Sequence, residues 1–172
     1  MNGLTFQPAF DVFHTMFRYL RIRDALGDEV IHRDQLRIAD FYLAFFFRAE
    51  NIRLKPKDQS IRKTARRVGP PSPYQRQPDD SLLFARMGPI QHASLRSLLH
   101  YGYFELAEEG TSFVATTDLR APDDLQQRIS QANAADHEVI EAIVRLIRDY
   151  PLTGRDGLKS RTALMEHRYD VI

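Results

Sequence analysis

The chain has 172 residues and a mass of 20.0 kDa, which is enough for one domain with a hydrophobic core. Hydrophobic residues make up 43% and charged residues 27%, as in globular proteins, which excludes a disordered or fibrous chain. The absence of cysteine excludes disulfides, thiolate metal sites and cysteine nucleophiles. No apolar run approaches the roughly 20 residues that span a bilayer, and residues 1–10 lack a signal-peptide pattern, so we expect a cytoplasmic protein with no membrane partner.

The basic charge is concentrated in one stretch. Residues 48–76 hold nine basic and two acidic residues, a net charge of +7, whereas the whole chain carries +1 and its remainder therefore −6. This stretch ends in a proline-rich sequence that cannot continue a helix or a central strand. We therefore divide one compact domain into an N-terminal helical module (1–47), a basic connector (48–78), a winged-helix-like portion (79–118) and a C-terminal part (119–172).

Two amphipathic helices are expected in the N-terminal module. The first spans 9–25, with Asp11 as its cap or in its first turn, and buries apolar residues at helical spacing while Arg18, Arg21 and Arg23 point elsewhere. A short β-prone stretch, 29–32, separates it from a second helix that runs to residue 47. Residues 41–47 are apolar nearly all round, so they are buried either within the chain or against a partner.

The winged-helix-like portion is expected to contain two helices and a hairpin. A short helix over 81–87 is broken by Gly88 and Pro89, and a second helix covers 90–101. The residues that follow, 103–107 and 113–117, alternate in the manner of β-strands around a turn at Gly110. A helix followed closely by a two-stranded hairpin is the order of a winged helix-turn-helix.

One long helix is expected over 123–150, ended by Pro151. Its apolar residues form a heptad-like seam with a single polar interruption at Asp136, and Ile140 and Ile147 widen the stripe. The pattern fits an ordinary core helix or a helix that packs against another chain. With a last short helix over 158–169, we expect an α+β, mainly α-helical fold with a winged-helix-like middle portion and a long C-terminal helix.

The sequence shows no catalytic constellation. No pair of histidines has metal-ligand spacing, and the chain contains neither a nucleophile elbow nor a glycine-rich phosphate loop. The paired carboxylates at 79–80 and 123–124 each precede an expected helix, where capping explains them. We therefore expect no enzyme activity and no cofactor.

The basic connector is the strongest candidate for ligand contact. Four of its cations would form one stripe on a helix and would attract phosphate groups, whereas the scarcity of aromatic residues argues against base stacking. An acidic protein surface or plain solvation of a loop are the alternatives. The candidate nucleic-acid contacts are Arg53, Lys55, Arg62, Lys63, Arg66 and Arg67.

Three blocks of the sequence, 7–18, 36–43 and 157–164 with 168–170, together resemble the middle component of three-component ABC ATPase systems. The resemblance spans nearly the whole chain and includes the order of helix and hairpin between the blocks. It implies a non-catalytic adaptor beside an ABC ATPase of the structural-maintenance-of-chromosomes (SMC) type and a nuclease-type effector, as in Lamassu-like defence systems. DNA contact through the phosphate backbone would accompany that role.

With the apolar run and the long helix, this resemblance leads to a set of expected partner contacts. The alternative function is a free-standing winged-helix transcription regulator, and a small nuclease is a further rival. The expected contacts come from the second helix, the long helix and the C-terminal block: Phe41, Tyr42, Phe45, Phe46, Ile140, Ile147, Leu158, Arg161, Arg168 and Tyr169.

Overall fold

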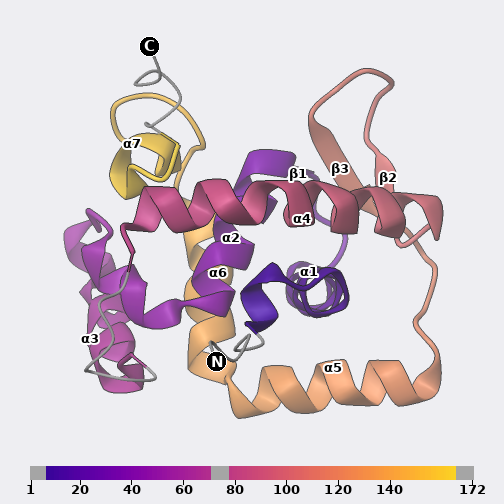
Figure 1. Cartoon of the computed structure of the whole chain (residues 1–172), viewed down its shortest axis with the longest axis horizontal. Coiled ribbons are helices and arrows are strands. Elements are labelled where there is room, and N and C mark those ends of the chain that lie inside the picture. Colours follow the sequence, from indigo (N-terminus) through magenta and orange to yellow (C-terminus); the bar gives the residue numbers. More distant parts are fainter. Residues whose placement is uncertain (1–6, 71–77, 166–172) are drawn as a thin grey trace, which may run out of the picture.

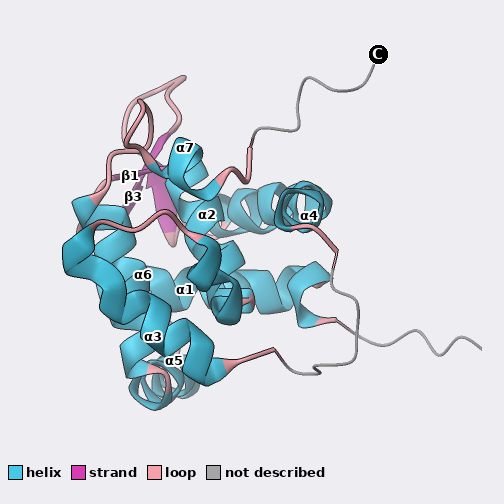
Figure 2. Cartoon of the chain, turned by 90° about the vertical axis from the view of Figure 1, so that its left-hand side faces the viewer, coloured by secondary structure: helices cyan, strands magenta, loops and turns pink. Residues whose placement is uncertain are grey.

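The computed structural model describes residues 7–70 and 78–165, which fold mainly into helices (Figures 1 and 2). This confirms the expected α+β, mainly helical class. The α-helices are α1 (Val12–Leu26), α2 (Arg33–Ala44), α3 (Gln59–Val68), α4 (Asp80–His100), α5 (Asp123–Ala135), α6 (His137–Asp149) and α7 (Leu158–Thr162). Three short 3-10 helices are η1 (Pro8–Phe10), η2 (Phe46–Asn51) and η3 (Pro56–Asp58).

Helix α1 begins at Val12, three residues after the expected start, because residues 8–10 form the separate 3-10 helix η1. The Asp11 carboxylate accepts a hydrogen bond of 2.9 Å from the backbone N–H of His14, which caps the helix. All three of its arginines were expected away from the buried face, but Arg18 and Arg21 are buried. Both are paired with acids of other helices, which is the condition under which charged side chains enter a protein interior.

Helix α2 is capped by His32 and is shorter than expected. It ends at Ala44, and the chain continues as the 3-10 helix η2 rather than as α-helix to residue 47. The change of helix type places Phe41 and Phe46 in the core while Phe45 and Phe47 remain half-buried. Helix α2 packs against α1, α4 and α6, so it lies at the centre of the fold.

The expected break at Gly88 and Pro89 does not occur, because α4 runs through Pro89 as one helix. A proline lacks the N–H that would bond the carbonyl of residue 85. Ala85 and Pro89 are both exposed, so the side of the helix that lacks this bond is accessible to solvent. The opposite side of α4 is continuous and buries Met87 and Leu95 among other residues, and this packing holds the helix together.

The expected long helix over 123–150 is divided at Asp136 into α5 and α6, which run in different directions (Figure 1). The Asp136 carboxylate accepts a hydrogen bond of 2.9 Å from Arg21 of α1. This contact with another helix holds Asp136, the polar residue of the seam, between α5 and α6. Helix α5 packs on α1, whereas α6 packs on α1, α2 and α3. The apolar residues of the seam therefore pack within this chain, on two helices that run in different directions.

A small antiparallel sheet lies beside the C-terminal half of α4 (Figure 1). The expected hairpin is confirmed as β2 (Phe104–Leu106) and β3 (Phe113–Thr116), and Gly110 in its loop has a φ of 75°, which favours glycine. The β-prone stretch before α2 contributes β1 (Ile31–His32), which pairs with β3 in the order β1-β3-β2. The winged-helix assignment stays a prediction.

Candidate interaction surfaces

The described part of the basic connector is folded and contains η2, η3 and α3. Ile61 and Ala65 face inward from α3 and are buried, while its cations lie on the opposite side. Arg66 pairs with Glu50 at 3.4 Å, and Arg67 pairs with Glu138 of α6. The connector therefore has neighbouring carboxylates from its own chain, and it is not a free loop.

Three of the predicted nucleic-acid residues instead bond to backbone carbonyl oxygens: Arg53 and Lys55 attach the connector to the rest of the chain, and Arg62 bonds within the connector. Arg53 donates to the carbonyl oxygen of Arg155 at 2.9 Å, and Lys55 donates from Nζ to the carbonyl oxygen of Asp149 at 2.6 Å. Arg62 bends back and donates to the carbonyl oxygens of Glu50 and Ile52 at 3.1 and 2.9 Å. Because these three side chains already donate hydrogen bonds to carbonyl oxygens of the chain, a structural role is enough to explain their presence.

Three exposed cations remain on α3, and we call Lys63, Arg66 and Arg67 the α3 cationic face. Lys63 is exposed and makes no polar contact within the residues that the structure describes. The side chains of Arg66 and Arg67 are about two-thirds exposed, and ion pairs at such sites stabilise a fold by roughly 0 to 1 kcal/mol. A phosphate group could therefore replace Glu50 or Glu138 as their partner.

Most of the predicted partner contacts lie in the core of this chain. Their burial is explained by packing within the chain, and their role at a partner interface stays a prediction. Arg161 is half-buried, stacks on Tyr150 and pairs with Asp156 at 2.9 Å, while Arg168 and Tyr169 lie outside the described residues. The core positions, which are at most 8% exposed, are Phe41, Tyr42, Phe46, Ile140, Ile147 and Leu158.

Phe45 differs from that group because it lines a hollow surface. A groove of about 990 Å³ lies between η1, α1, the end of α2, the end of α3 and α4, with the joint of α5 and α6 on one side. Arg21 and Arg86 also border it. We call this the aromatic groove; its apolar walls include Phe10, Phe17, Phe45, Phe46, Phe47 and Val139.

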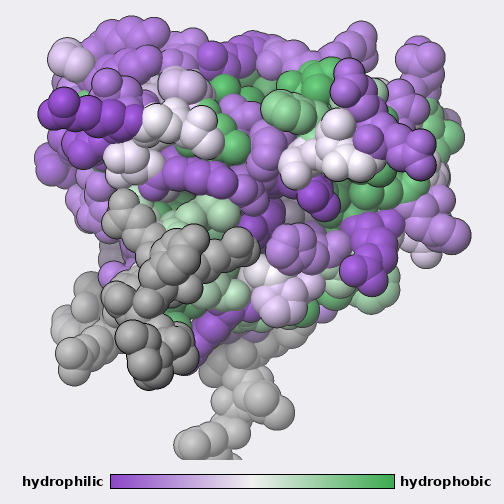
Figure 3. All heavy atoms as spheres, turned by 90° about the horizontal axis from the view of Figure 1, so that it is seen from above, coloured by the Kyte–Doolittle hydropathy of each residue, from purple (hydrophilic) through white to green (hydrophobic). Residues whose placement is uncertain are grey.

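Apolar side chains also reach the surface outside the groove. Phe13 of α1 is 79% exposed, and Tyr101 and Phe113 are exposed at the end of α4 and on the sheet. On the face seen from above, hydrophobic residues form patches that hydrophilic side chains separate (Figure 3). Patches of this kind are common on monomeric proteins and do not by themselves indicate an interface.

A buried polar network connects three helices, and the sequence analysis missed it. Arg18 of α1 donates to Asp40 of α2 at 2.6 Å, and Gln91 of α4 donates to the same carboxylate at 2.9 Å. Arg37 donates from Nε to the Gln91 side-chain oxygen at 3.1 Å. Burial raises the pKa of Asp40, and Arg18 and Gln91 act in the opposite direction. The available signal was Asp40 itself, which stands at helical spacing between Leu36 and Leu43.

A second buried carboxylate, Asp58, ties the connector to α6. The Tyr150 hydroxyl donates to Asp58 at 2.7 Å, and Arg145 of α6 pairs with the same carboxylate. Burial raises the pKa of Tyr150 to about 12, and Asp58 adds to this effect, while the hydrogen bond from the backbone N–H of Lys55 opposes it. Both networks hold secondary-structure elements together. Within the described ranges, no group of three or more histidine, aspartate or glutamate residues could hold a metal ion.

The comparisons with known proteins decide the family. A model described as ABC-three component (ABC-3C) system Middle Component 5 matches residues 4–170. The chain belongs to this family. No curated protein matches it, and no solved structure does. Because the match includes all the residues that the structure describes, the α3 cationic face and the aromatic groove both lie within the part of this middle component that the family model covers. None of the described helices is long and apolar enough to cross a membrane.

Proposed function

We propose that this middle component is a non-catalytic adaptor that joins an SMC-like ABC ATPase to a nuclease-type effector in a Lamassu-like defence system. The observation that carries the proposal is the family match over residues 4–170, because a middle component of a three-component system has protein partners. The geometry supports it with two separate contact surfaces. The aromatic groove suits a protein segment, and the α3 cationic face suits a phosphate backbone.

The aromatic groove is our candidate for the protein partner. Its walls come from several helices, among them α1, α4 and α6, and carry aromatic side chains, which are enriched in the energetically important parts of interfaces. Val68 at the end of α3 also lines it, so the groove adjoins the α3 cationic face. A partner seated there would therefore stand beside any nucleic acid bound along α3.

Co-purification tests the adaptor role. The chain is expressed with the ABC ATPase and the third component of its own system, and complex formation is measured by pull-down and size-exclusion chromatography. Phe45→Ser and Val139→Arg change the groove from α2 and from α6, and each is expected to weaken the complex at least tenfold. Phe13→Ser, at an exposed apolar site outside the groove, is the matched control and keeps full binding, and thermal unfolding verifies that all three fold. A wild-type chain that binds neither component, or that turns over a substrate alone, contradicts the proposal.

DNA contact is tested separately by the salt dependence of binding. Replacing Lys63, Arg66 and Arg67 by glutamine removes three exposed cations and is expected to flatten the slope of log K against log salt by about two to three. The control replaces three other exposed cations by glutamine, so the charge change is the same. Equal slopes for the two variants overturn the DNA contact and leave the adaptor role intact. The control positions are Arg96, Arg120 and Arg128.

The same assays address the alternative of a free-standing transcription regulator. That reading requires residues 79–118 to bind DNA as a winged helix, with α4 entering a groove. Most residues on the inner face of α4 pack in the hydrophobic core, and Gln91 is fully buried in the polar network. These residues are not available to contact DNA. Sequence-specific binding by the isolated chain would support this alternative and overturn the adaptor.

A further inference from the structure

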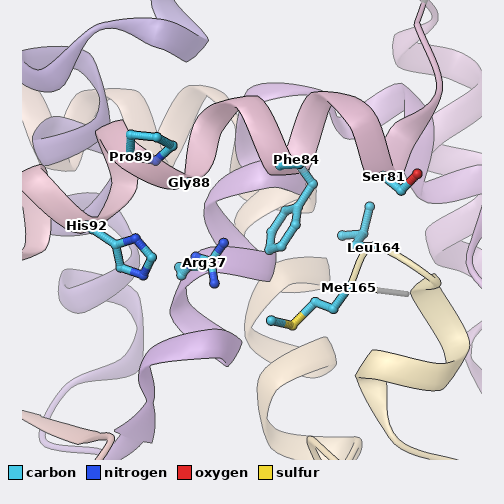
Figure 4. A pocket seen from close by; sticks show the side chains of 9 residues that line it. Arg37, Ser81, Phe84, Gly88, Pro89, His92, Leu164 and Met165 are labelled. Carbon is cyan, nitrogen blue, oxygen red and sulfur yellow. The ribbon is translucent and has the colours of Figure 1, made fainter. Parts of the chain in front are cut away.

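A small pocket lies between α2, α4 and the segment that follows α7, away from the aromatic groove and from α3 (Figure 4). Its volume is about 280 Å³, near the lower end of the roughly 300 to 1,000 Å³ that ligand pockets span. Phe84 and Pro89 of α4 line it together with Leu164 and Met165. Arg37 of α2 is at its floor, and Ser81 and His92 of α4 add polar groups to the otherwise apolar walls.

Arg37 presents an unused donor to this pocket. Its side chain is 6% exposed, its Nε donates to Gln91 at 3.1 Å, and its Nη1 donates to Asp34 at 3.2 Å. Its Nη2 has no hydrogen-bond partner in the part of the chain that the structure describes. This nitrogen is 3.5 Å from the position that a Cβ atom would take at Gly88, so it lies at the wall that faces α4.

Among the residues that the structure describes, the charges around Arg37 do not balance. Asp40 pairs with Arg18 at 2.6 Å, while Asp34 serves both Arg37 at 3.2 Å and Lys159 of α7 at 2.7 Å. The connected cluster thus contains three cations and two carboxylates. Because a buried cation without a full counter-charge is unfavourable, an anion beside the Nη2 of Arg37 would complete the cluster.

We propose that this pocket binds a monocarboxylate carried on an apolar stem, with Arg37 as its anchor. One carboxylate supplies the single missing negative charge and accepts a hydrogen bond from Nη2. The stem lies against Phe84, whose ring is 4.7 Å from the Arg37 guanidinium carbon, and against Leu164 and Met165. A phosphate dianion fits less well, since its second negative charge exceeds the single charge that the cluster lacks and would lie against Phe84, Leu164 and Met165.

Gly88 offers a variant that blocks the pocket without removing a charge. A methyl group at this position meets the Arg37 Nη2 at 3.5 Å, which is an ordinary contact, so Gly88→Ala keeps the fold while it occupies the place of the ligand. Its φ is not positive, and alanine favours a helix interior over glycine. The control is Arg96→Gln, which removes an exposed cation of the same helix outside the pocket.

Binding is measured on the full chain by NMR titration with hexanoate, benzoate and inorganic phosphate. We expect saturable shifts of the Phe84 and Gly88 amides and of the Arg37 side chain with both carboxylates, at least tenfold weaker binding to Gly88→Ala, and unchanged binding to Arg96→Gln. Absence of saturation, equal binding by Gly88→Ala, equal loss in Arg96→Gln, or phosphate binding as tight as hexanoate would each overturn the proposal.

A second pair of probes distinguishes a free acid from a carboxylate of a protein. N-acetyl-leucine-leucine with a free C-terminal carboxylate is compared with its amide. Tighter binding of the free dipeptide than of hexanoate supports a protein carboxylate as the natural ligand, and the reverse supports a small organic acid. A dipeptide amide that binds as well as the free dipeptide contradicts recognition of the carboxylate by Arg37.

Discussion

The polar network among α1, α2 and α4 and the α3 cationic face use the same residue types in opposite ways. In the network, Arg18 and Asp40 are buried, and both partners of the Asp40 carboxylate, Arg18 and Gln91, come from other helices. On α3, Arg66 and Arg67 are exposed and pair with Glu50 and Glu138 at the surface. The interior pair is costly to desolvate and cannot exchange partners, whereas the surface pairs are weak and exchangeable. The first arrangement specifies a fold, and the second leaves charge available for a ligand.

The largest effect is expected from the centre of the network. Asp40→Asn keeps the shape of the side chain but removes the counter-charge of Arg18, so a buried cation is left without its anion. We expect a loss of about 3 to 5 kcal/mol in the free energy of unfolding, measured by urea denaturation. The surface counterpart, Glu50→Gln, is expected to change it by less than about 1 kcal/mol.

A double variant separates the cost of an unpaired charge from the value of the pair. Arg18→Met with Asp40→Leu replaces both partners by apolar groups and is expected to recover most of the stability lost in Asp40→Asn. A double variant as unstable as the single one would show that the network contributes more than charge compensation. Similar effects of Asp40→Asn and Glu50→Gln would remove the distinction between the interior and the surface.

The N-terminus of α2 lies between these extremes and is sensitive to pH. The half-buried His32 accepts a hydrogen bond of 3.0 Å at Nδ1 from the backbone N–H of Asp34. Burial lowers the pKa of His32 from 6.5, the Asp34 carboxylate opposes this, and Lys159 and Arg33 add to it. A lowered pKa in the folded state means that the cap contributes stability above pH 6.5 and loses it as the pH falls through the lowered pKa.

Replacing this histidine should remove that pH dependence. His32→Asn keeps a capping acceptor and cannot titrate, so urea denaturation at pH 7.5, 6.5 and 5.5 is expected to show a smaller acid-side loss of stability than in the wild type. His100→Asn, at an exposed site near the end of α4, serves as the control and should follow the wild-type profile. An unchanged profile for His32→Asn would place the acid sensitivity elsewhere.

Local signals predicted the elements, and tertiary contacts determined where they end. The Asp11 cap and the turn at Gly110 depend on neighbouring residues, so the cap of α1 and the hairpin were predicted correctly. The continuity of α4 through Pro89 depends on its packing, and the break at Asp136 places this residue against Arg21, 115 positions away. Neither contact is visible in a local pattern.

The candidate sites show the same difference between features that a local pattern predicts and features that depend on tertiary contacts. The cationic stripe was predictable because the spacing of its members on a helix is a local property. The carboxylates that face it come from η2 and α6, and the burial of Phe41 and Ile140 depends on helices that only the folded chain brings together. The buried network was missed because charged residues are expected at the surface, an expectation that fails when the partners are paired.

The smallest effect on stability, and the sharpest test of exchange, is expected at Glu138. The hydrogen bond from Arg67 lowers the pKa of Glu138, while its slight desolvation acts in the opposite direction, so the carboxylate is charged at neutral pH and competes with a phosphate for Arg67. Glu138→Gln should leave the melting temperature unchanged and tighten DNA binding several-fold at low salt, with a steeper salt slope. Glu141→Gln removes an exposed carboxylate of the same helix that does not contact α3, and it corrects for the change in net charge. Equal tightening by both variants would mean that only the overall charge matters, and the exposed position of Arg67 would then have no specific consequence for binding.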